Sequence, residues 1–88
     1  MIDMIIFFSD EYNEEHWSTY ANCFAAADVH IAGIPQDIVN AVVGLLGDKA
    51  GLKWLMDTPL AQFNGMKATD VLHTPKGERA LKAFIMRL

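Results

Sequence analysis

The sequence predicts an all-α, single-domain bundle of about four to five short helices. Three observations support this class: apolar residues recur at helical spacing from residue 10 onward, Pro and Gly residues divide the chain into short segments, and Ser, Thr or Asp residues precede several of these segments as helix caps. The chain has 88 residues, of which 52% are hydrophobic, so it can bury one core with little margin.

Residues 1–34 are expected to form an acidic N-terminal segment with one helix. Residues 4–8 are an apolar block that is too short to be assigned by periodicity, so a short strand stays open as an alternative. Ser9 is expected to cap a helix that begins near residue 10 and fades by Val29. The apolar stripe of this helix, with its histidine partly buried, is expected to contain Tyr12, His16, Tyr20 and Phe24.

Residues 35–88 are expected to form a series of helices within the same compact domain. Pro35 suits the first turn of a helix that should be central to the core, and Gly47 suits the left-handed position after its end. Asp48 is expected to cap the next helix, which carries Leu52, Leu55 and Met56, with Trp54 on its flank.

Capping residues also mark the last elements of the chain. Asn64-Gly65 accepts positive φ angles and should end a turn that starts at Thr58-Pro59. Thr69 is expected to cap a short helix through Leu72, and Thr74 with Pro75 should open the last helix. One face of that helix is expected to be lined by Ala80, Leu81, Phe84, Ile85 and Leu88.

The charges are divided between the two halves of the chain. Residues 1–47 contain seven acidic residues and no Lys or Arg, which gives −7. Residues 48–88 contain seven basic and four acidic residues, which gives 7 − 4 = +3 and a total of −4. This division fits self-complementary packing or oligomerisation, an acidic face for a basic partner, or two solvated surfaces.

Composition also limits the compartment and the class of partner. A single cysteine, Cys23, forms no internal disulfide, which favours a reducing cytoplasm. The apolar block at residues 4–8 is far shorter than a membrane span and lacks the features of a signal peptide. An acidic chain whose basic residues are scattered lacks the electrostatic attraction that supports DNA binding, so we expect none from this chain alone.

No residue pattern predicts catalysis, a metal site or a cofactor. His16, His30 and His73 do not have zinc-ligand spacing. Cys23 lies two helical turns from His16, or roughly 10 Å, which is too far for a nucleophile and its base. The sequence therefore predicts a protein that is not an enzyme and carries no cofactor. A solvated helix face is the better interpretation of the carboxylates at Glu11, Glu14 and Glu15.

An ordered signature runs from Leu46-Gly47-Asp48 to the C-terminus. Its segments are Trp54-Leu55, Thr58-Pro59, Phe63-Asn64-Gly65, Asp70-Val71-Leu72 and Thr74-Pro75-Lys76-Gly77. This set resembles the toxin-binding domain at the C-terminus of Xre/MbcA/ParS-type bacterial antitoxins. The positions that match the structural motif of that family are Trp54, Leu55, Pro59, Phe63, Gly65, Leu72 and Gly77.

The resemblance implies a binding function. Members of this family bind a RES-domain toxin that consumes NAD, their C-terminal end covers the entrance to the toxin's active site, and they commonly form dimers. The segment from Arg79 to Leu88 matches the toxin-facing end. The side chains expected to contact the partner are therefore Arg79, Lys82, Phe84, Arg87 and Leu88.

Two features depart from the family pattern. Residues 1–34 are too few and too acidic to supply the helix-turn-helix with which most members bind their promoter. The chain also stops at Leu88, where family members often continue for several residues. The alternative hypothesis is a small phage-encoded or accessory inhibitor of a different host protein complex, for example a defence system.

Overall fold

The computed structural model describes residues 4–88, which are 65% helical and contain no strand. The all-α prediction is confirmed. The elements in order are α1 (Met4–Glu11), α2 (Glu14–Ala21), α3 (Gln36–Leu46), α4 (Asp48–Asp57), the 3-10 helix η1 (Ala61–Phe63), α5 (Ala68–Val71) and α6 (Pro75–Ile85).

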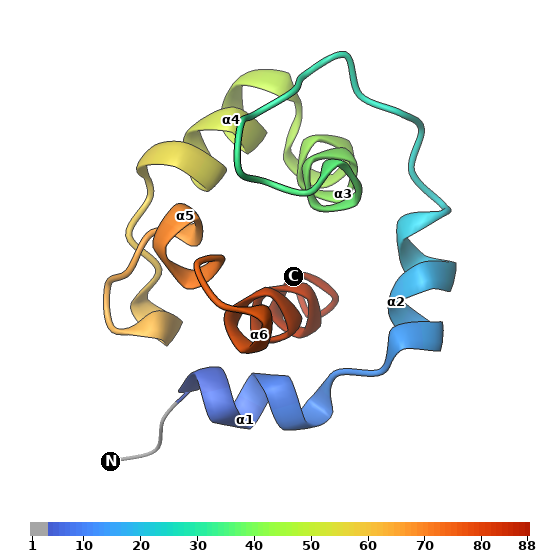
Figure 1. Ribbon diagram of the computed structural model, residues 1–88. Helices are drawn as coiled ribbons and strands as arrows, with labels where there is room; N and C mark the ends of the chain where they lie inside the picture. The colour runs from blue at the N-terminus through green and yellow to red at the C-terminus, as the bar shows by residue number, and fades with distance from the viewer. Residues whose placement is uncertain (1–3) are drawn as a thin grey trace.

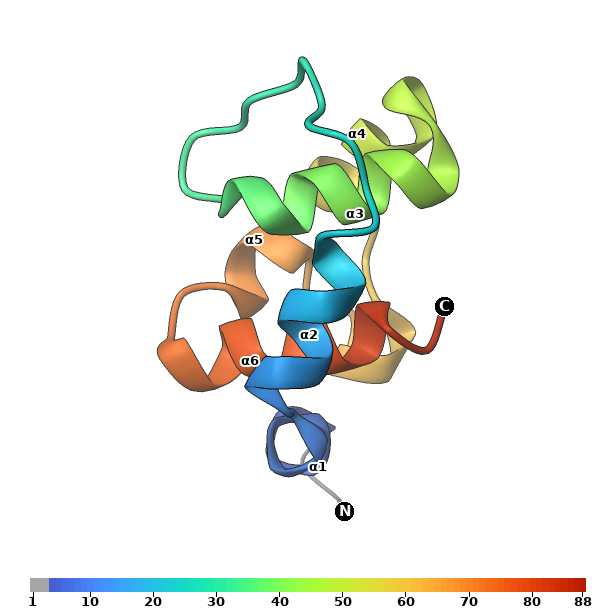
Figure 2. The same cartoon turned by 90° about the vertical axis from the view of Figure 1, so that its right-hand side faces the viewer.

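Helix α6 occupies the centre of the molecule, with α1, α2, α3 and α5 arranged around it (Figure 1). Its most extensive packing is against α1, which crosses it at a steep angle (Figures 1 and 2). Because neighbours cover α6 on several sides, it buries more residues than α3, which we had expected to be the central helix. The buried residues of α6 are Gly77, Ala80, Leu81, Ala83, Phe84 and Ile85.

The N-terminal segment forms two helices rather than one. Residues 4–8 belong to α1, so the strand alternative is wrong, and Ser9 lies inside α1 instead of capping a later helix. The two helices are separated at Asn13, which has an extended backbone. Its side-chain oxygen caps α2 by accepting a 3.0 Å hydrogen bond from the His16 amide. Helix α2 turns Trp17 into the core and leaves His16 exposed, which corrects the expected stripe.

Helix α2 ends at Ala21, well before the predicted end near Val29. The loop that follows arches over α3 (Figure 2). Side chains of α3 hold this loop: Asn40 Oδ1 accepts a hydrogen bond of 2.9 Å from the Ala27 amide, and Gln36 Nε2 donates one of 3.0 Å to the Val29 carbonyl. Two backbone groups of the loop are therefore bonded by side chains of α3 in place of a longer helix.

Helices α3 and α4 form a hairpin around Gly47, whose φ of 91° is positive as expected, whereas its ψ of 166° differs from the left-handed helical conformation. Gly47 also precedes α4 at the capping position, so Asp48 is the first helical residue and not its cap. A Cβ atom on Gly51 would lie only 3.0 Å from the Cα of Val43, so a glycine lets α4 approach α3 closely. Pro35 is likewise the cap of α3 and lies just before its first turn.

The turns around α5 and α6 follow local residue chemistry. Asn64 and Gly65 adopt φ angles of 58° and 80°, as expected. Thr74 caps α6 by accepting a 3.0 Å hydrogen bond from the Gly77 amide, and Pro75 is the first helical residue, which confirms the predicted start. The cap predicted for α5 is wrong because Thr69 lies inside the helix, after Lys67 in the capping position.

An aromatic cluster joins α1, η1, α4 and α6. The ring of Phe84 lies 5.4 Å from the rings of both Phe8 and Phe63 and stacks on Trp54 at 6.3 Å. The rings of Phe8 and Phe63 are 5.6 Å apart. This cluster fixes α1 against α6 and thereby positions the surfaces described below.

Candidate functional site

The five residues predicted to contact a partner do not form one exposed surface. Phe84 is only 8% exposed because it lies inside the aromatic cluster. Leu88 is 55% exposed and lies beyond the last residue of α6, so it does not line the apolar face of that helix. Phe84 is therefore part of the core, whereas Leu88 is accessible.

Lys82 is held by contacts within the domain. Its Nζ lies 3.7 Å from Oδ2 of Asp37 and 3.8 Å from Oε2 of Glu78. The ammonium group also lies 5.6 Å from the ring of Trp17 and 5.9 Å from that of Tyr12. With 12% of its side chain exposed, Lys82 links α2, α3 and α6 and has little charge to offer a partner.

Arg87 and Arg79 differ in their availability. Arg87 forms an ion pair with Glu11, and its guanidinium lies 5.8 Å from the ring of Phe8. Arg79 is exposed and forms no ion pair within residues 4–88. The pairs Glu11–Arg87 and Asp37–Lys82 join the acidic half of the chain to its basic half, so part of the charge division reflects self-complementary packing.

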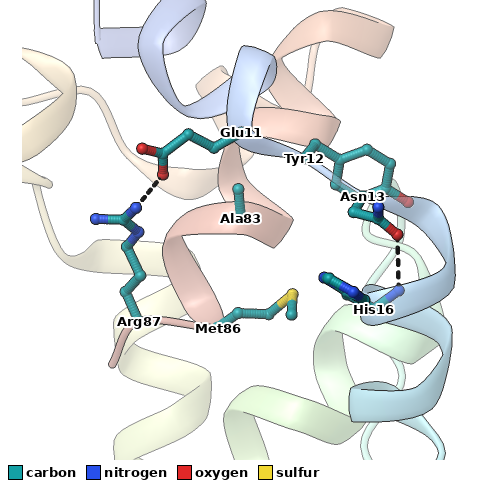
Figure 3. A pocket seen from close by; sticks show the side chains of 7 residues that line it. All are labelled: Glu11, Tyr12, Asn13, His16, Ala83, Met86 and Arg87. Atoms are coloured by element: carbon teal, nitrogen blue, oxygen red, sulfur yellow. Dashed lines mark hydrogen bonds and ion pairs between the residues drawn. The ribbon is translucent and has the colours of Figure 1, made fainter.

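A pocket of about 240 Å³ lies where α1 and α2 meet the end of α6. Figure 3 shows Glu11 and Arg87 paired on one side of the pocket and Tyr12, Asn13 and His16 on the other. Ala83 and Met86 lie between these two sides. The lining residues are Glu11, Tyr12, Asn13, His16, Ala83, Met86 and Arg87.

The phenol of Tyr12 in this pocket stays protonated at neutral pH. Burial, followed by the hydrogen bond that Tyr12 donates to Glu14, raises its pKa well above the ordinary value of 10. A general base for neutral pH needs a pKa near 7, and these contacts shift the phenol in the opposite direction. Tyr12 is therefore a packing and hydrogen-bonding residue of the pocket wall.

A larger pocket of about 380 Å³ lies along the outer side of α4. Leu52 and Met56 contribute its apolar surface, and each is 41% exposed. The charged residues that line it are Lys49, Lys53 and Asp57. Of the three apolar residues expected on this helix, only Leu55 is buried, whereas Leu52 and Met56 share an outer side with Lys49 and Lys53, as their helical spacing allows.

Exposed apolar side chains are also present elsewhere on the domain. Within the described chain, seven large apolar residues are at least 40% exposed, and they come from α1, the end of α3, α4 and the C-terminus. They are Ile6, Phe7, Leu45, Leu46, Leu52, Met56 and Leu88.

The residues of the signature between Leu46 and the C-terminus mostly support the fold. Leu55 and Phe63 are buried, whereas Trp54 and Leu72 are half-buried and Pro59 is exposed. The two glycines meet backbone requirements: Gly65 has a positive φ, and a Cβ atom on Gly77 would lie 1.8 Å from the carbonyl oxygen of Val71.

Three further observations bear on the function. No group of three His, Cys, Asp or Glu residues in the described part of the chain could hold a metal ion. None of the helices formed by residues 4–88 has the length and apolar character needed to cross a bilayer. No protein-family model, curated protein or solved structure matches the chain.

Proposed function

We propose that this chain is a non-catalytic protein-binding module that acts as an antitoxin by binding and neutralising a RES-type, NAD-consuming toxin. The observation that carries the binding role is that seven large apolar side chains stay at least 40% exposed on a small domain that also buries a core. Large exposed apolar side chains that adjoin one another, as Leu52 and Met56 do along α4, commonly mark a protein interface. The class of partner rests on the signature between Leu46 and Leu88.

The motif residues and the exposed residues have separate tasks in this proposal. The motif residues Leu55, Phe63 and Gly77 build the scaffold. Arg79 is exposed in the first half of α6, and Arg87 and Leu88 are exposed just beyond its last residue, where all three side chains are accessible to a toxin. These three side chains replace the five-residue surface expected from the sequence.

The charge of these exposed side chains suits an acidic surface on the partner. The guanidinium of Arg79 is unpaired within residues 4–88, and the side chain of Arg87 stays 57% exposed despite its ion pair with Glu11. Arginine forms paired hydrogen bonds with carboxylates and phosphates. The two arginines can therefore pair with acidic groups of a toxin that uses NAD.

The test is neutralisation of a RES-type toxin inside bacteria. The toxin is expressed from an inducible promoter with or without this chain, and cellular NAD and growth are followed. We expect the chain to preserve NAD and growth and to co-purify with the toxin. A matched control carries Phe63→Asp, which should unfold the core and abolish protection.

A folded chain that neither binds the toxin nor preserves NAD would contradict the proposal. Circular dichroism of the purified chain establishes that it is folded in this experiment. That outcome would favour the alternative hypothesis of an inhibitor directed at a different host protein complex. Action on an NAD-consuming toxin would also place the chain in the bacterial cytoplasm, where the substrate of the toxin is found.

A further inference from the structure

We infer that the outer face of α4 is a second docking surface, which binds an acidic amphipathic helix of a partner protein. This surface is separate from the end of α6 and does not depend on the partner being a toxin. We call it the α4 groove and define it by its lining residues Lys49, Leu52, Lys53, Met56 and Asp57.

Helix α4 has two apolar faces, of which the domain uses one. Gly51 and Leu55 face the interior: Leu55 is fully buried, and Gly51 lies against the backbone of α3. Leu52 and Met56 follow these residues by one position, so the 100° rotation per residue of an α-helix turns them away from the core. Both remain 41% exposed.

The two lysines of the α4 groove are free of ion pairs, in contrast to Lys82 and Arg87. Lys82 and Arg87 pair with acidic residues of the N-terminal half, whereas Lys49 and Lys53 form no ion pair among residues 4–88. The two lysines are four residues apart and therefore lie on one side of the helix. They give the groove a positive edge beside the apolar strip of Leu52 and Met56.

A helix with apolar anchors and acidic neighbours complements this surface. Anchors spaced at i, i+3, i+4 and i+7 fit between the side chains of a facing helix, and their burial supplies the binding energy. Carboxylates beside these anchors would meet Lys49 and Lys53, which favours rapid association and one register. Asp57 at the far end of the groove disfavours a carboxylate there and so selects one orientation of the partner helix.

An anionic membrane surface fits the same groove less well. Lysine beside leucine and methionine is also found on helices that bind membranes, but such helices have a large basic and apolar face. The chain carries a net charge of −4, and residues 1–47 alone carry −7, so an anionic bilayer repels most of the molecule. A protein helix contacts only α4 and avoids this repulsion.

The test uses a synthetic helical peptide of about 18 residues, which is long enough to form a helix. Its apolar anchors are leucines at i, i+3, i+4 and i+7, and its flanking positions are glutamates. A second peptide carries lysine in place of every glutamate. Titration of the isotope-labelled chain is followed by NMR, and we expect the amide signals of α4 to shift. The glutamate peptide should bind roughly tenfold more tightly than the lysine peptide at low salt.

Two double variants separate the groove from the overall charge of the chain. Lys49→Glu with Lys53→Glu should weaken binding of the glutamate peptide roughly tenfold. The matched control, Lys67→Glu with Lys76→Glu, changes the net charge equally at exposed residues outside the groove and should leave binding unchanged. Leu52→Ser should also weaken binding, with an unchanged melting temperature because the side chain is exposed.

Several outcomes would overturn the inference. These are no binding of the glutamate peptide, equal binding of both peptides, or signal shifts centred on Ile6 and Phe7 of α1 instead of on α4. Equal loss of binding in the two double variants would show a general charge effect. Binding to vesicles of phosphatidylserine and phosphatidylcholine, without binding to the peptide, would assign the groove to a membrane surface.

Discussion

The indole Nε1 of Trp17 donates a hydrogen bond of 2.9 Å to Oδ2 of Asp37, and this bond joins α2 to α3. Trp17 is 2% exposed, so the carboxylate satisfies the polar atom of a buried ring. The same oxygen lies 3.7 Å from Nζ of Lys82, which adds α6 to the contact. One side chain of α3 thus connects three helices that are distant in the sequence.

Removal of this carboxylate should destabilise the domain. We expect Asp37→Ala to lower the free energy of unfolding by about 1–3 kcal/mol, because the buried indole loses its acceptor and Lys82 loses an ion pair. Asp37→Asn keeps an oxygen acceptor for the indole and should therefore lose less stability than Asp37→Ala. Urea denaturation followed by tryptophan fluorescence measures both changes. Asp28→Ala, at an exposed loop residue, is the control, and an equal loss in that variant would contradict this role of Asp37.

Gly77 is predicted to tolerate no side chain. A Cβ atom there would lie 1.8 Å from the Val71 carbonyl oxygen and 2.9 Å from its carbon, and these are backbone atoms that cannot rotate away. We expect Gly77→Ala to cost about 3 kcal/mol, at the upper end of overpacking effects. Thermal and urea denaturation would measure the loss.

Gly44→Ala is the matched control for Gly77→Ala. Its Cβ atom would meet the ring of Phe24, a half-buried side chain that can shift, and alanine favours the helical backbone by about 1 kcal/mol. This variant should stay close to the original stability. A Gly77→Ala protein as stable as Gly44→Ala would show that α5 and α6 can separate without cost.

Local chemistry explains which parts of the fold could be predicted from the sequence. Thr74 with Pro75, Asn64-Gly65 and Gly47 form their cap or turn within a few residues, and all three were placed correctly. The break at Asn13 was missed, although Asn followed by two glutamates is a typical start of a helix. Ser9 offers a similar signal, and what separates the two is the packing of α1 against α6, a contact between distant parts of the chain.

The candidate site was less predictable for the same reason. The sequence places Lys82 and Arg87 on the polar side of the last helix, but their accessibility depends on Asp37 and Glu11. The partner of Arg87 is 76 residues away in the sequence, so no local pattern indicates the pair. The exposed face of α4, in contrast, follows from helical spacing once Gly51 and Leu55 are assigned to the core.

The two tryptophans should contribute unequally to stability. Trp17 is fully buried, and its truncation to alanine should cost roughly 3–5 kcal/mol. Trp54 is half-buried and stacks on Phe84 with an interplanar angle of 8°, so Trp54→Ala should cost less, about 2 kcal/mol. Trp54→Phe should recover part of this loss. An unchanged melting temperature in Trp54→Ala would show that its stacking does not support the core.

The domain should lose stability in alkaline solution. Burial and the hydrogen bond with Glu14 raise the folded-state pKa of Tyr12 above the ordinary value of 10, and burial also raises that of Tyr20. Below pH 10 both phenols are neutral in the folded and unfolded chains, so their full contribution to the free energy of unfolding is present. Above pH 10 the unfolded chain releases these protons more readily, which favours unfolding.

Melting temperatures between about pH 8 and 11 test this dependence. The original chain should lose stability above pH 10, and Tyr12→Phe should lose less because it has one fewer phenol to ionise. The lysines also titrate in this range, and comparison of the two proteins removes their shared contribution. Parallel curves for the two proteins would contradict the role of Tyr12.

Reversal of the charges of Arg79 and Arg87 tests whether these side chains contact the partner. Arg79→Glu should leave the melting temperature nearly unchanged, whereas Arg87→Glu should cost about 0.2–1 kcal/mol because it replaces an exposed ion pair with repulsion from Glu11. If the end of α6 faces a toxin, the double variant should associate more slowly at low salt. Stopped-flow mixing or surface plasmon resonance measures this rate, with Lys67→Glu as the control. A double variant that associates as rapidly as the original chain would place the toxin interface elsewhere. The next surfaces to test would then be the α4 groove and the acidic face of residues 10–28.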